Sequence, residues 1–585
     1  MTKEEVSAVL EEIGTLLELK GESPFRCNAY RNGARAIQQL EGNLKEYVEA
    51  GRLGDIPGIG DTLREKITVL VTTGRLPFHE ELKASLPPAL VQMLRIPGLG
   101  PKKIKQLYDT LKITDIESLR LACQTGQVAA LKGFGVKSQQ KILEGIQFLG
   151  QVGNRVRIDQ ALPIGISLLE RIRLIPGVIR AELCGSLRRR RETAKDIDIL
   201  ASAADPIPVM QAFVRMPEVV QVVGQGDTKS SVVVQKYIGS ERITLNADLR
   251  VVADEQFPFA LHYFTGSKEH NIRVRQRAID RGFRLNEYEL AASDRKVHCR
   301  DESELFAALD LHWIPPELRE DTGEIDAATR VAGQTENRLP TLIEAADIRG
   351  VFHNHSTWSD GVNTIEEMAR GAIELGFEYL GIADHSQSLS IANGLSPARL
   401  HAQLEEIDAL NEKLAPFRIF KGSEVDILPD GSLDFPDDVI DALDYVVASV
   451  HTHFQMPVEE MTNRIIRAMQ HPKVTMLGHA TGRLLLRREG YRVDLDRVLE
   501  AVAAAGKMIE INAQPMRLDL DWVYCKRAKS LDIALVINPD AHRVAELEFF
   551  RFGVDVARRG WLEKSDVLNT SSFEEVRVRL RERCT

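Results

Sequence analysis

The chain has 585 residues, 44% hydrophobic and 27% charged, a composition that excludes wholesale disorder and a length that predicts several domains. No apolar run reaches membrane-spanning length, and the acidic amphipathic start MTKEEVSAVLEEIG lacks the features of a secretory signal, so we expect a cytoplasmic protein. Residues 1–300 carry 44 Lys and Arg against 36 Asp and Glu, whereas residues 301–585 carry 31 against 49, so only the first part suits a polyanion.

The first 150 residues are predicted to be helical. Apolar residues recur at helical spacing in SAVLEEIGTLLEL, AYRNGARAIQQL and TLREKITVLVTTG, and the pattern continues to residue 150. We expect one helical domain over residues 1–90 and a second over residues 91–150.

Three segments in this region place Gly-x-Gly before a helix rich in Lys or Arg: DIPGIGDTLREKI, RIPGLGPKKIKQL and LKGFGVKSQQKI. A tight glycine turn presents free N–H groups at a helix N-terminus, where the helix dipole also favours an anion. One such turn alone is usually structural, but three in series resemble helix-hairpin-helix elements, which contact DNA phosphates without reading sequence. The glycines expected at DNA are Gly58, Gly60, Gly98, Gly100, Gly133 and Gly135.

Strands alternate with helices from about residue 155 to 310, for example in KDIDILAS, SVVVQKYI and RITLNADLRVVA. Asp196 and Asp198 alternate on the first of these strands, so both carboxylates face the same way. Alone, an Asp-x-Asp pair is more often a solvated strand face. Asp248 on a later strand adds a third carboxylate, and three of them suit two Mg²⁺ or Mn²⁺ ions for phosphoryl transfer.

The segment CGSLRRRRETAK precedes this aspartate pair. Gly185, Ser186 and the arginines at 188–191 offer backbone amides, a hydroxyl and guanidinium forks, which together could cradle a triphosphate.

Residues 1–316 resemble a family-X DNA polymerase, related to polymerase beta. The resemblance includes NAYRNGARAI, GSLRRRRETAKDID, QGDTKSSVVV, HYFTGSKEHNIRVRQRA and RGFRLNEYEL. It implies a palm over residues 151–255 and a nucleotide-binding thumb over 256–316, with residues 1–90 as the 8-kDa-like domain and 91–150 as fingers. It also implies that Asp196, Asp198 and Asp248 hold the catalytic metals. The residues expected at the nucleotide are Gly185, Ser186, Arg189, Tyr263, Phe264, Gly266, Asn271 and Arg275, with Arg275 at the template minor groove.

Some positions depart from that family. Lys195 and Arg190 stand where glycine is common, and Asn246 replaces an arginine of polymerase beta. These changes bear on substrate handling and rate more than on reaction class. Lys66 matches a lysine that forms a Schiff base with an abasic sugar, but a helper lysine of the family is Thr62 here. A phosphate contact is therefore the favoured role of Lys66, and lyase chemistry the less favoured one.

The polar segment HWIPPELREDTGEIDAATRVAGQTENRLP, punctuated by Pro and Gly, predicts a linker over residues 317–340. Beyond it, short strands such as YLGIADH, YVVASVH and KMIEINA alternate with amphipathic helices. That rhythm predicts a parallel sheet or barrel.

Histidines and acids follow these strands, beginning with VFHNHSTWSDG, and Asp384 and His453 belong to the same pattern. A lone histidine at a strand end is most often structural, as we expect for His401 and His471, but this many favours a metal site. The segment resembles the PHP (polymerase and histidinol phosphatase) superfamily, which implies a distorted (βα)7 barrel over residues 341–585 that holds up to three Mn²⁺ or Zn²⁺ ions. The implied ligands are His353, His355, Asp360, His385, Glu424, His451, His479, Asp540 and His542.

The scattered cysteines (Cys27, Cys123, Cys184, Cys299, Cys525 and Cys584) are expected to be reduced thiols. The sequence thus predicts a multidomain α/β protein, monomeric and bound to DNA and dNTPs. We expect a DNA polymerase that fills short gaps during repair, with a 3′–5′ exonuclease in the PHP domain. A DNA-end scaffold, an end-processing nuclease with a weak palm, and a PHP site for small phosphate esters remain alternatives.

Overall fold

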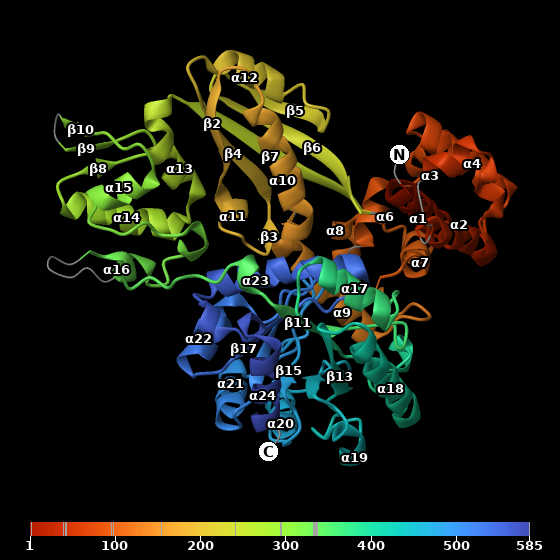
Figure 1. Ribbon diagram of the computed structural model, residues 1–585. Coiled ribbons are helices and arrows are strands. Elements are labelled where there is room, and N and C mark those ends of the chain that lie inside the picture. Colours follow the sequence, from red (N-terminus) through yellow and green to blue (C-terminus); the bar gives the residue numbers. More distant parts are fainter. Residues whose placement is uncertain are drawn as a thin grey trace. The chain divides into compact units, whose positions relative to one another are not determined.

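The computed structural model describes residues 1–585 except 2, 39, 41–43, 95, 97, 98, 154, 240, 293, 294, 331–336, 584 and 585. The chain groups into two compact units, and Figure 1 labels the helices and strands along the chain. The first comprises residues 1–156, 214–224 and 231–247, and the second comprises residues 157–213, 225–230 and 248–585. No helix in the described ranges is both long and apolar enough to cross a membrane.

Residues 1–152 form helices, as predicted. These are α1 (Lys3–Lys20), α2 (Pro24–Gln38), α3 (Leu44–Glu49), α4 (Asp61–Thr73), α5 (Pro77–Ala84), α6 (Pro88–Met93), α7 (Pro101–Leu111), α8 (Ile116–Gln124) and α9 (Val136–Val152). One cluster of buried apolar side chains runs from Val6 to Ile146. The helices on both sides of the expected boundary at residue 90 therefore contribute to one continuous core.

The palm region contains the strands that were predicted from KDIDILAS, SVVVQKYI and RITLNADLRVVA. Its elements are β1 (Val156–Arg157), α10 (Ile158–Arg173), β2 (Val178–Leu183), α11 (Gly185–Arg188), β3 (Thr193–Ala194), β4 (Asp196–Ala203), α12 (Pro206–Phe213), β5 (Val219–Gln225), β6 (Lys229–Ile238) and β7 (Glu241–Val252). The sheet order is β2-β4-β7-β6-β5, and β2 is antiparallel to β4. Alternate residues of β7 are buried, as the period of a strand requires.

The thumb region packs helices around a small antiparallel sheet of order β10-β9-β8. Its elements are α13 (Phe257–Thr265), α14 (Lys268–Asp280), β8 (Arg284–Leu285), β9 (Leu290–Ala292), β10 (Arg295–Val297), α15 (Glu302–Ala308) and α16 (Glu324–Ala328). Ser267 caps α14 by accepting a hydrogen bond from the His270 amide, and Asp301 caps α15 in the same way through Glu304.

The segment expected to be a linker is folded between residues 317 and 330. Leu318, Ile325 and Ala328 belong to the apolar core of the thumb. Arg319 is fully buried and forms an ion pair with Glu302 at 2.6 Å. The polar composition of this segment is typical of an exposed linker. Composition alone does not reveal that charged side chains such as Arg319 are buried and paired inside the protein.

The last 235 or so residues form the predicted barrel, with strands surrounded by helices. Its strands are β11 (Gly350–Asn354), β12 (Tyr379–Ile382), β13 (Arg418–Asp426), β14 (Tyr445–Ser449), β15 (Met476–Leu477), β16 (Met508–Asn512) and β17 (Leu535–Asn538). Its helices are α17 (Ile365–Glu374), α18 (Pro397–Lys413), α19 (Asp437–Ile440), α20 (Val458–Met469), α21 (Leu495–Ala504), α22 (Trp522–Ser530), α23 (Phe550–Arg559) and α24 (Phe573–Arg583).

All seven barrel strands are parallel and follow sequence order. The barrel nearly closes through a parallel bridge between Asn354, at the end of β11, and Ala541, beyond β17. Aromatic rings fill its interior: Phe352 lies 5.0 Å from Tyr445, centroid to centroid. A Cβ on Gly381 or Gly422 would lie 2.6 Å or less from Tyr445 side-chain atoms, so glycine at both positions makes room for this ring.

We predict that Glu302→Gln destabilises the thumb, because Glu302 pairs with Arg188 at 2.7 Å and with buried Arg319. Removing the shared anion leaves two buried guanidinium groups uncompensated, which costs about 3–5 kcal/mol. The midpoint of thermal unfolding should therefore fall. Glu304→Gln on the same helix removes a pair with an exposed arginine, Arg300, and should change the midpoint little. Equal midpoints for the two variants would contradict this account.

Candidate active sites

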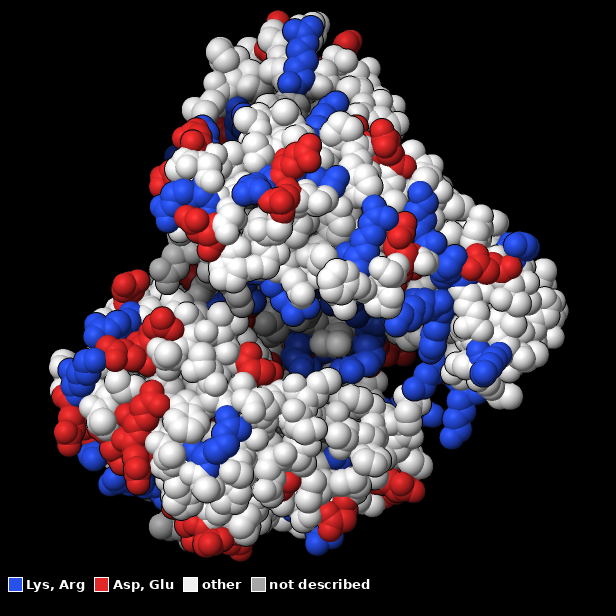
Figure 2. Space-filling model, turned by 90° about the vertical axis from the view of Figure 1, so that its right-hand side faces the viewer, with Lys and Arg blue, Asp and Glu red and all other residues white. Residues whose placement is uncertain are grey.

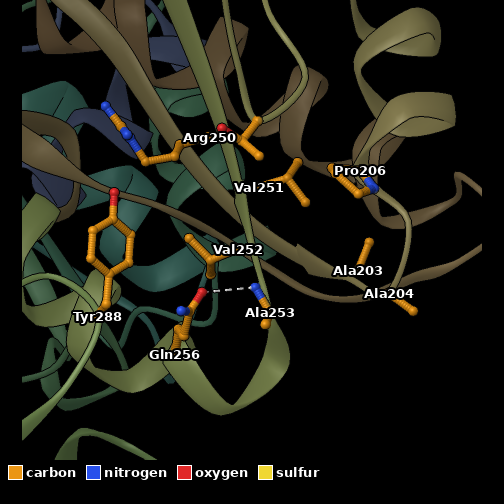
Figure 3. A pocket seen from close by; sticks show the side chains of 10 residues that line it. Ala203, Ala204, Pro206, Arg250, Val251, Val252, Ala253, Gln256 and Tyr288 are labelled. Carbon is orange, nitrogen blue, oxygen red and sulfur yellow. Dashed lines mark hydrogen bonds between the residues drawn. The ribbon is translucent and has the colours of Figure 1, made fainter.

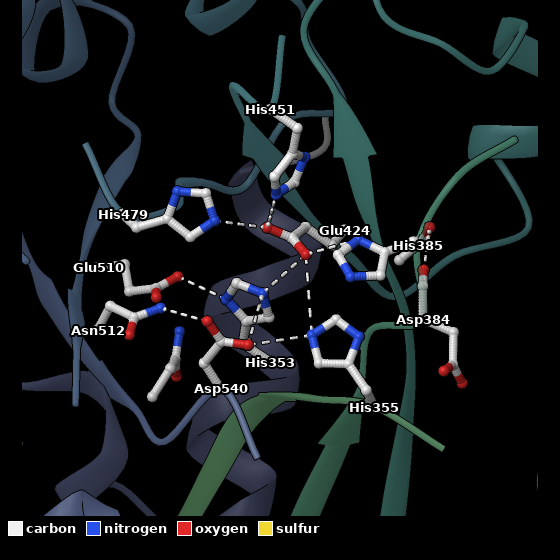
Figure 4. A network of polar contacts seen from close by, with 12 residues as sticks. His353, His355, Asp384, His385, Glu424, His451, His479, Glu510, Asn512 and Asp540 are labelled. Carbon is white, nitrogen blue, oxygen red and sulfur yellow. Dashed lines mark hydrogen bonds and ion pairs between the residues drawn. The ribbon is translucent and has the colours of Figure 1, made fainter. Parts of the chain in front are cut away.

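The nine residues expected to bind metal in the barrel lie together, and Figure 4 shows the part of the group around Glu424. Each lies in a barrel strand or in the segment that follows one, and the carboxyl ends of parallel strands meet at one end of a barrel. They are His353, His355, Asp360, His385, Glu424, His451, His479, Asp540 and His542.

Glu424 is the central carboxylate of this cluster. Its Oε2 lies 2.9 Å from Nδ1 of His385 and 3.2 Å from Nε2 of His353. Its Oε1 lies 2.9 Å from Nε2 of His479 and 3.2 Å from Nε2 of His451. Glu424 is only 1% exposed, so its charge must be balanced by these histidines or by bound cations.

Two further carboxylates alternate with the histidines. Asp540 Oδ1 lies 3.2 Å from Nε2 of His355. Asp360 Oδ1 lies 3.5 Å from Nε2 of His542 and 3.7 Å from Nε2 of His385. Three overlapping groups therefore have donor atoms close enough to share an ion: His355, Asp360, His385 and His542; His353, His355 and Asp540; and His385, Glu424 and His451.

Burial and the neighbouring charges shift the pKa values of two histidines of the cluster in opposite directions. Burial opposes protonation of His353, but Glu510, Glu424 and Asp540 outweigh it and raise its pKa well above the usual value. Burial and the nearby His542 and His385 lower the pKa of His355 to about 3, so it remains a neutral donor. Within the described chain, neither ring nitrogen of His355 has a hydrogen-bond partner. Unpartnered buried nitrogens beside carboxylates fit a site for divalent cations.

Polar residues around the cluster orient its members, and these were not foreseen. Oε2 of Glu510 in β16 lies 2.7 Å from Nδ1 of His353, at hydrogen-bond distance, and Asn512 donates a hydrogen bond to Asp540 at 3.0 Å. Asp426 contacts Nδ1 of His451 at 2.8 Å. The only sequence signal for Glu510 was an acid between two isoleucines in the strand MIEIN.

Other residues of the same sequence pattern lie outside the metal groups. Asp384 is buried and accepts hydrogen bonds from Ser356 and Gln403, so it braces the loop after β11. His453 is exposed at a left-handed backbone position. His401 contacts the carbonyl of Pro397 on its own helix, α18.

The palm carries the second group of carboxylates. Asp196 and Asp198 begin β4, and Asp248 in β7 forms an ion pair with Lys229 at 2.7 Å. Burial, with the charges of Asp196 and Asp248, raises the pKa of Asp198 to about 6. Gly185 has a φ of 57°, and a Cβ there would lie 2.3 Å from Oδ2 of Asp198. Glycine therefore lets the first residue of α11 approach this carboxylate.

The arginines beside this carboxylate group are already engaged. Arg188 pairs with Glu302. The Nε of Arg189 lies 3.1 Å from Glu320, and its Nη1 donates to the carbonyl of Thr265. Ser186 is half-buried in α11.

The other residues expected at the nucleotide lie around the end of α13. The rings of Tyr263 and Phe264 meet edge to face, and Asn271 donates to the Tyr263 carbonyl at 2.7 Å. A Cβ on Gly266 would lie 2.9 Å from Nη1 of Arg189, so this glycine accommodates the guanidinium. Arg275 is exposed on α14.

A cavity of about 370 Å³ opens elsewhere in the palm (Figure 3). Ala203 and Ala204 contribute to it from the end of β4 opposite the one that carries Asp196 and Asp198. Its lining is Ala203, Ala204, Pro206, Thr228, Arg250, Val251, Val252, Ala253, Gln256 and Tyr288, none of them a residue expected at the nucleotide.

Five of the six expected DNA-binding glycines are described, and Gly98 lies outside the described residues. A Cβ on Gly58, Gly60, Gly100, Gly133 or Gly135 would have no neighbour within 4 Å, so these turns are open. Gly58 and Gly133 have positive φ, and Gly60 and Gly100 precede the first residues of α4 and α7.

Lys66 lies in α4 with its Nζ 4.0 Å from the centre of the Phe78 ring. Figure 2 shows that Lys and Arg side chains project from this face of the molecule, some of them in groups. Such groups offer positive charge for contacts with phosphates.

Comparison with known domain families assigns most of the chain. Residues 1–76 match a helix-hairpin-helix domain, and residues 91–147 match a SAM-like helix-hairpin-helix tandem. Residues 260–320 match the DNA polymerase beta thumb, and residues 352–514 match the PHP domain. These matches confirm the predicted fold class.

Individual relatives extend the assignment. A Bacillus subtilis (strain 168) protein, the DNA polymerase/3′–5′ exonuclease PolX, is 40% identical over 583 residues, which are 99% of this chain and 100% of the relative. A probable phosphatase of Thermoanaerobacter sp. (strain X514) is 29% identical over 230 residues, 37% of this chain and 89% of the relative. A probable phosphatase of Caldanaerobacter subterraneus is 28% identical over 243 residues, 40% of this chain and 90% of the relative.

We predict that Glu510→Gln weakens metal binding in the barrel. Glutamine keeps a hydrogen bond to His353 but removes the charge that makes the imidazole a better donor, and loss of such a partner typically costs about 10–100-fold in metal affinity. Titration with Mn²⁺ and equilibrium dialysis would measure the change. Glu500→Gln on α21 is the control, because Glu500 is exposed and pairs only with Arg527 at 3.3 Å among the described contacts. Unchanged Mn²⁺ affinity in Glu510→Gln would contradict a role for this carboxylate.

Proposed function

Because the chain belongs to the PolX family of DNA polymerases with a 3′–5′ exonuclease, we propose how its two catalytic regions divide that work. The palm adds nucleotides, and the PHP barrel trims 3′ ends. The observation that carries the proposal is the presence of two separate groups of carboxylates, one on β4 and β7 and one interleaved with histidines in the barrel.

In the palm, we propose that Asp196, Asp198 and Asp248 hold the divalent cations of nucleotidyl transfer. Such cations stabilise negative charge on the attacking and leaving oxygens of an in-line displacement. Ser186 and Arg189 would contact the triphosphate of the dNTP, and Tyr263 would oppose a 2′-hydroxyl on its sugar. Lys229 balances Asp248 in this structure, so it would yield this carboxylate on metal binding.

In the barrel, we propose that the nine His, Asp and Glu residues hold the cations for phosphodiester hydrolysis. Bound cations of this kind supply a hydroxide at neutral pH. Glu424 would contribute to more than one ion, since its two oxygens contact different histidines. Buried Glu510 would keep the His353 ring oriented.

Divalent metal use follows from both activities, and the donor sets favour particular ions. The all-carboxylate palm suits Mg²⁺ or Mn²⁺. The histidine-rich barrel suits Mn²⁺ or Zn²⁺, with up to three ions, because imidazole nitrogen is a better partner for these metals than for Mg²⁺.

DNA is the partner that the helix-hairpin-helix domains imply. We propose that the protein acts as a monomer on gapped or primer-template DNA, filling short gaps during repair in the cytoplasm. The expected glycine turns would contact phosphates, and Lys66 would be a phosphate contact more readily than a lyase nucleophile. A scaffold without catalysis is not favoured. Small phosphate esters as substrates are less favoured than DNA, because DNA-binding domains share the chain.

We predict that the double substitution Asp196→Ala and Asp198→Ala abolishes primer extension and leaves 3′ trimming intact. The two residues supply two of the three carboxylates in the palm, so no cation pair can assemble without them. Extension of a labelled primer on gapped DNA and degradation of a 3′-labelled single strand would be measured on the same preparation. Extension near the wild-type rate would refute the assignment.

We predict the reverse separation for His353→Ala and for Asp540→Ala, which should remove 3′ trimming and spare nucleotide addition. Losing a ligand lowers metal affinity and misplaces the hydroxide that the metal makes available. Mn²⁺ should support trimming better than Mg²⁺. His401→Ala is the matched control, because the polar contact of this histidine among the described residues is with its own helix. Normal trimming by His353→Ala would place the nuclease elsewhere.

A further inference from the structure

Arg189 is held at two of its three guanidinium nitrogens. Its Nε lies 3.1 Å from Oε1 of Glu320, and its Nη1 donates to the Thr265 carbonyl at 2.5 Å. Only 11% of its side chain is exposed. The planar guanidinium is therefore fixed in orientation by one carboxylate and one carbonyl, without rotamer freedom to lose when a ligand binds.

The carboxylate that fixes Arg189 is shared with the barrel. Oε1 of Glu320 also lies 3.1 Å from Nη1 of Arg559, the last residue of α23. The same Nη1 donates to the backbone carbonyl of Arg189 at 2.7 Å. Arg559 thus contacts both the backbone of Arg189 and the anion that its side chain pairs with.

Arg559 is rigidly placed by the barrel. Its side chain is fully buried, and its guanidinium lies over the Trp522 ring at 4.7 Å. Its helix approaches the barrel strands closely: a Cβ on Gly553 would lie 2.6 Å from Ile537 of β17. In the described chain, Nε and Nη2 of Arg559 make no hydrogen bond, so Nη1 carries both polar contacts.

We propose that Arg559 and Glu320 are positioning residues of the polymerase's nucleotide site, so that a barrel residue sets the orientation of Arg189. The inference rests on the proposed contact between Arg189 and the triphosphate. Arg559 shares Oε1 of Glu320 with Arg189, and it anchors the Arg189 backbone directly. Without Arg559, the ion-pair partners of Glu320 in the described part of the chain are Arg189 and the more distant Arg191 at 3.8 Å.

The test is the kinetics of single-nucleotide insertion on gapped DNA by the full chain. For Arg559→Ala and for Glu320→Gln we expect the KM for dNTP to rise about three- to tenfold, the effect of losing one hydrogen-bonded orientation, with kcat within about twofold. Arg559→Lys keeps the charge and should give an intermediate KM. Combining Arg559→Ala with Glu320→Gln should raise KM no further than either alone, because both act through Arg189.

Arg558→Ala is the matched control, because Arg558 also ties α23 to the thumb, through Glu317 at 2.9 Å, without contacting Arg189. Its KM for dNTP should stay at the wild-type value, and 3′ trimming by every variant reports that the barrel is folded. An equal rise in the KM for dNTP in Arg558→Ala would show that any loosening of α23 from the thumb has this effect, and would overturn the proposal. An unchanged KM for dNTP in Glu320→Gln would also overturn the proposal. This variant keeps the size of the side chain, so it remains a test if Arg559→Ala fails to fold.

Arg189→Ala separates this inference from the function on which it rests. If Arg189→Ala leaves the KM for dNTP unchanged, the proposed triphosphate contact itself is wrong. If Arg189→Ala raises KM but neither Arg559→Ala nor Glu320→Gln does, only the positioning role is wrong.

Discussion

The buried charge of Glu424 is the constraint on which the barrel depends. A carboxylate at 1% exposure is stable only beside positive charge, and five histidines surround it, from the carboxyl ends of four strands: β11, β12, β14 and β15. Each histidine must therefore come from a strand that ends at the same level, which the parallel order β11 to β17 provides. The close approach of the Phe352 and Tyr445 rings, permitted by Gly381 and Gly422, keeps those strands in place beneath the cluster.

The sequence alone predicted the fold class and the residues that the structure gathers in both groups. This was possible because strand period, strand-end position and ligand chemistry are all local properties, as Asp196 with Asp198 and His353 with His355 illustrate. Glu510 was missed because its role depends on how β16 lies relative to β11, which the local pattern does not contain. The folded segment at 317–330 was missed for the same reason: the partners of Arg319 and Glu324 are Glu302 and His270, distant in sequence.

The structure also changes how the arginine run at 188–191 is understood. From the sequence, four consecutive arginines suggested a cradle for a triphosphate. In the folded chain Arg188 pairs with Glu302 in the thumb, Arg189 pairs with Glu320, and Arg190 lies 3.8 Å from Asp555 in α23. The run therefore forms ion pairs with carboxylates of the thumb and the barrel, and the two catalytic regions share charged groups at this point.

The burial of Arg319 and Glu324 has a consequence for dividing the enzyme into its halves. A polymerase fragment that stops at residue 316 would lose both side chains, and would leave His270 without Glu324 and Glu302 with Arg188 in place of two arginines. A fragment that continues through Thr329 keeps these pairs and the bridge from Thr329 to Leu311. The boundary between the two halves of this chain therefore lies after α16, the last buried helix of the thumb. Truncated forms made to separate the two activities should end or begin there.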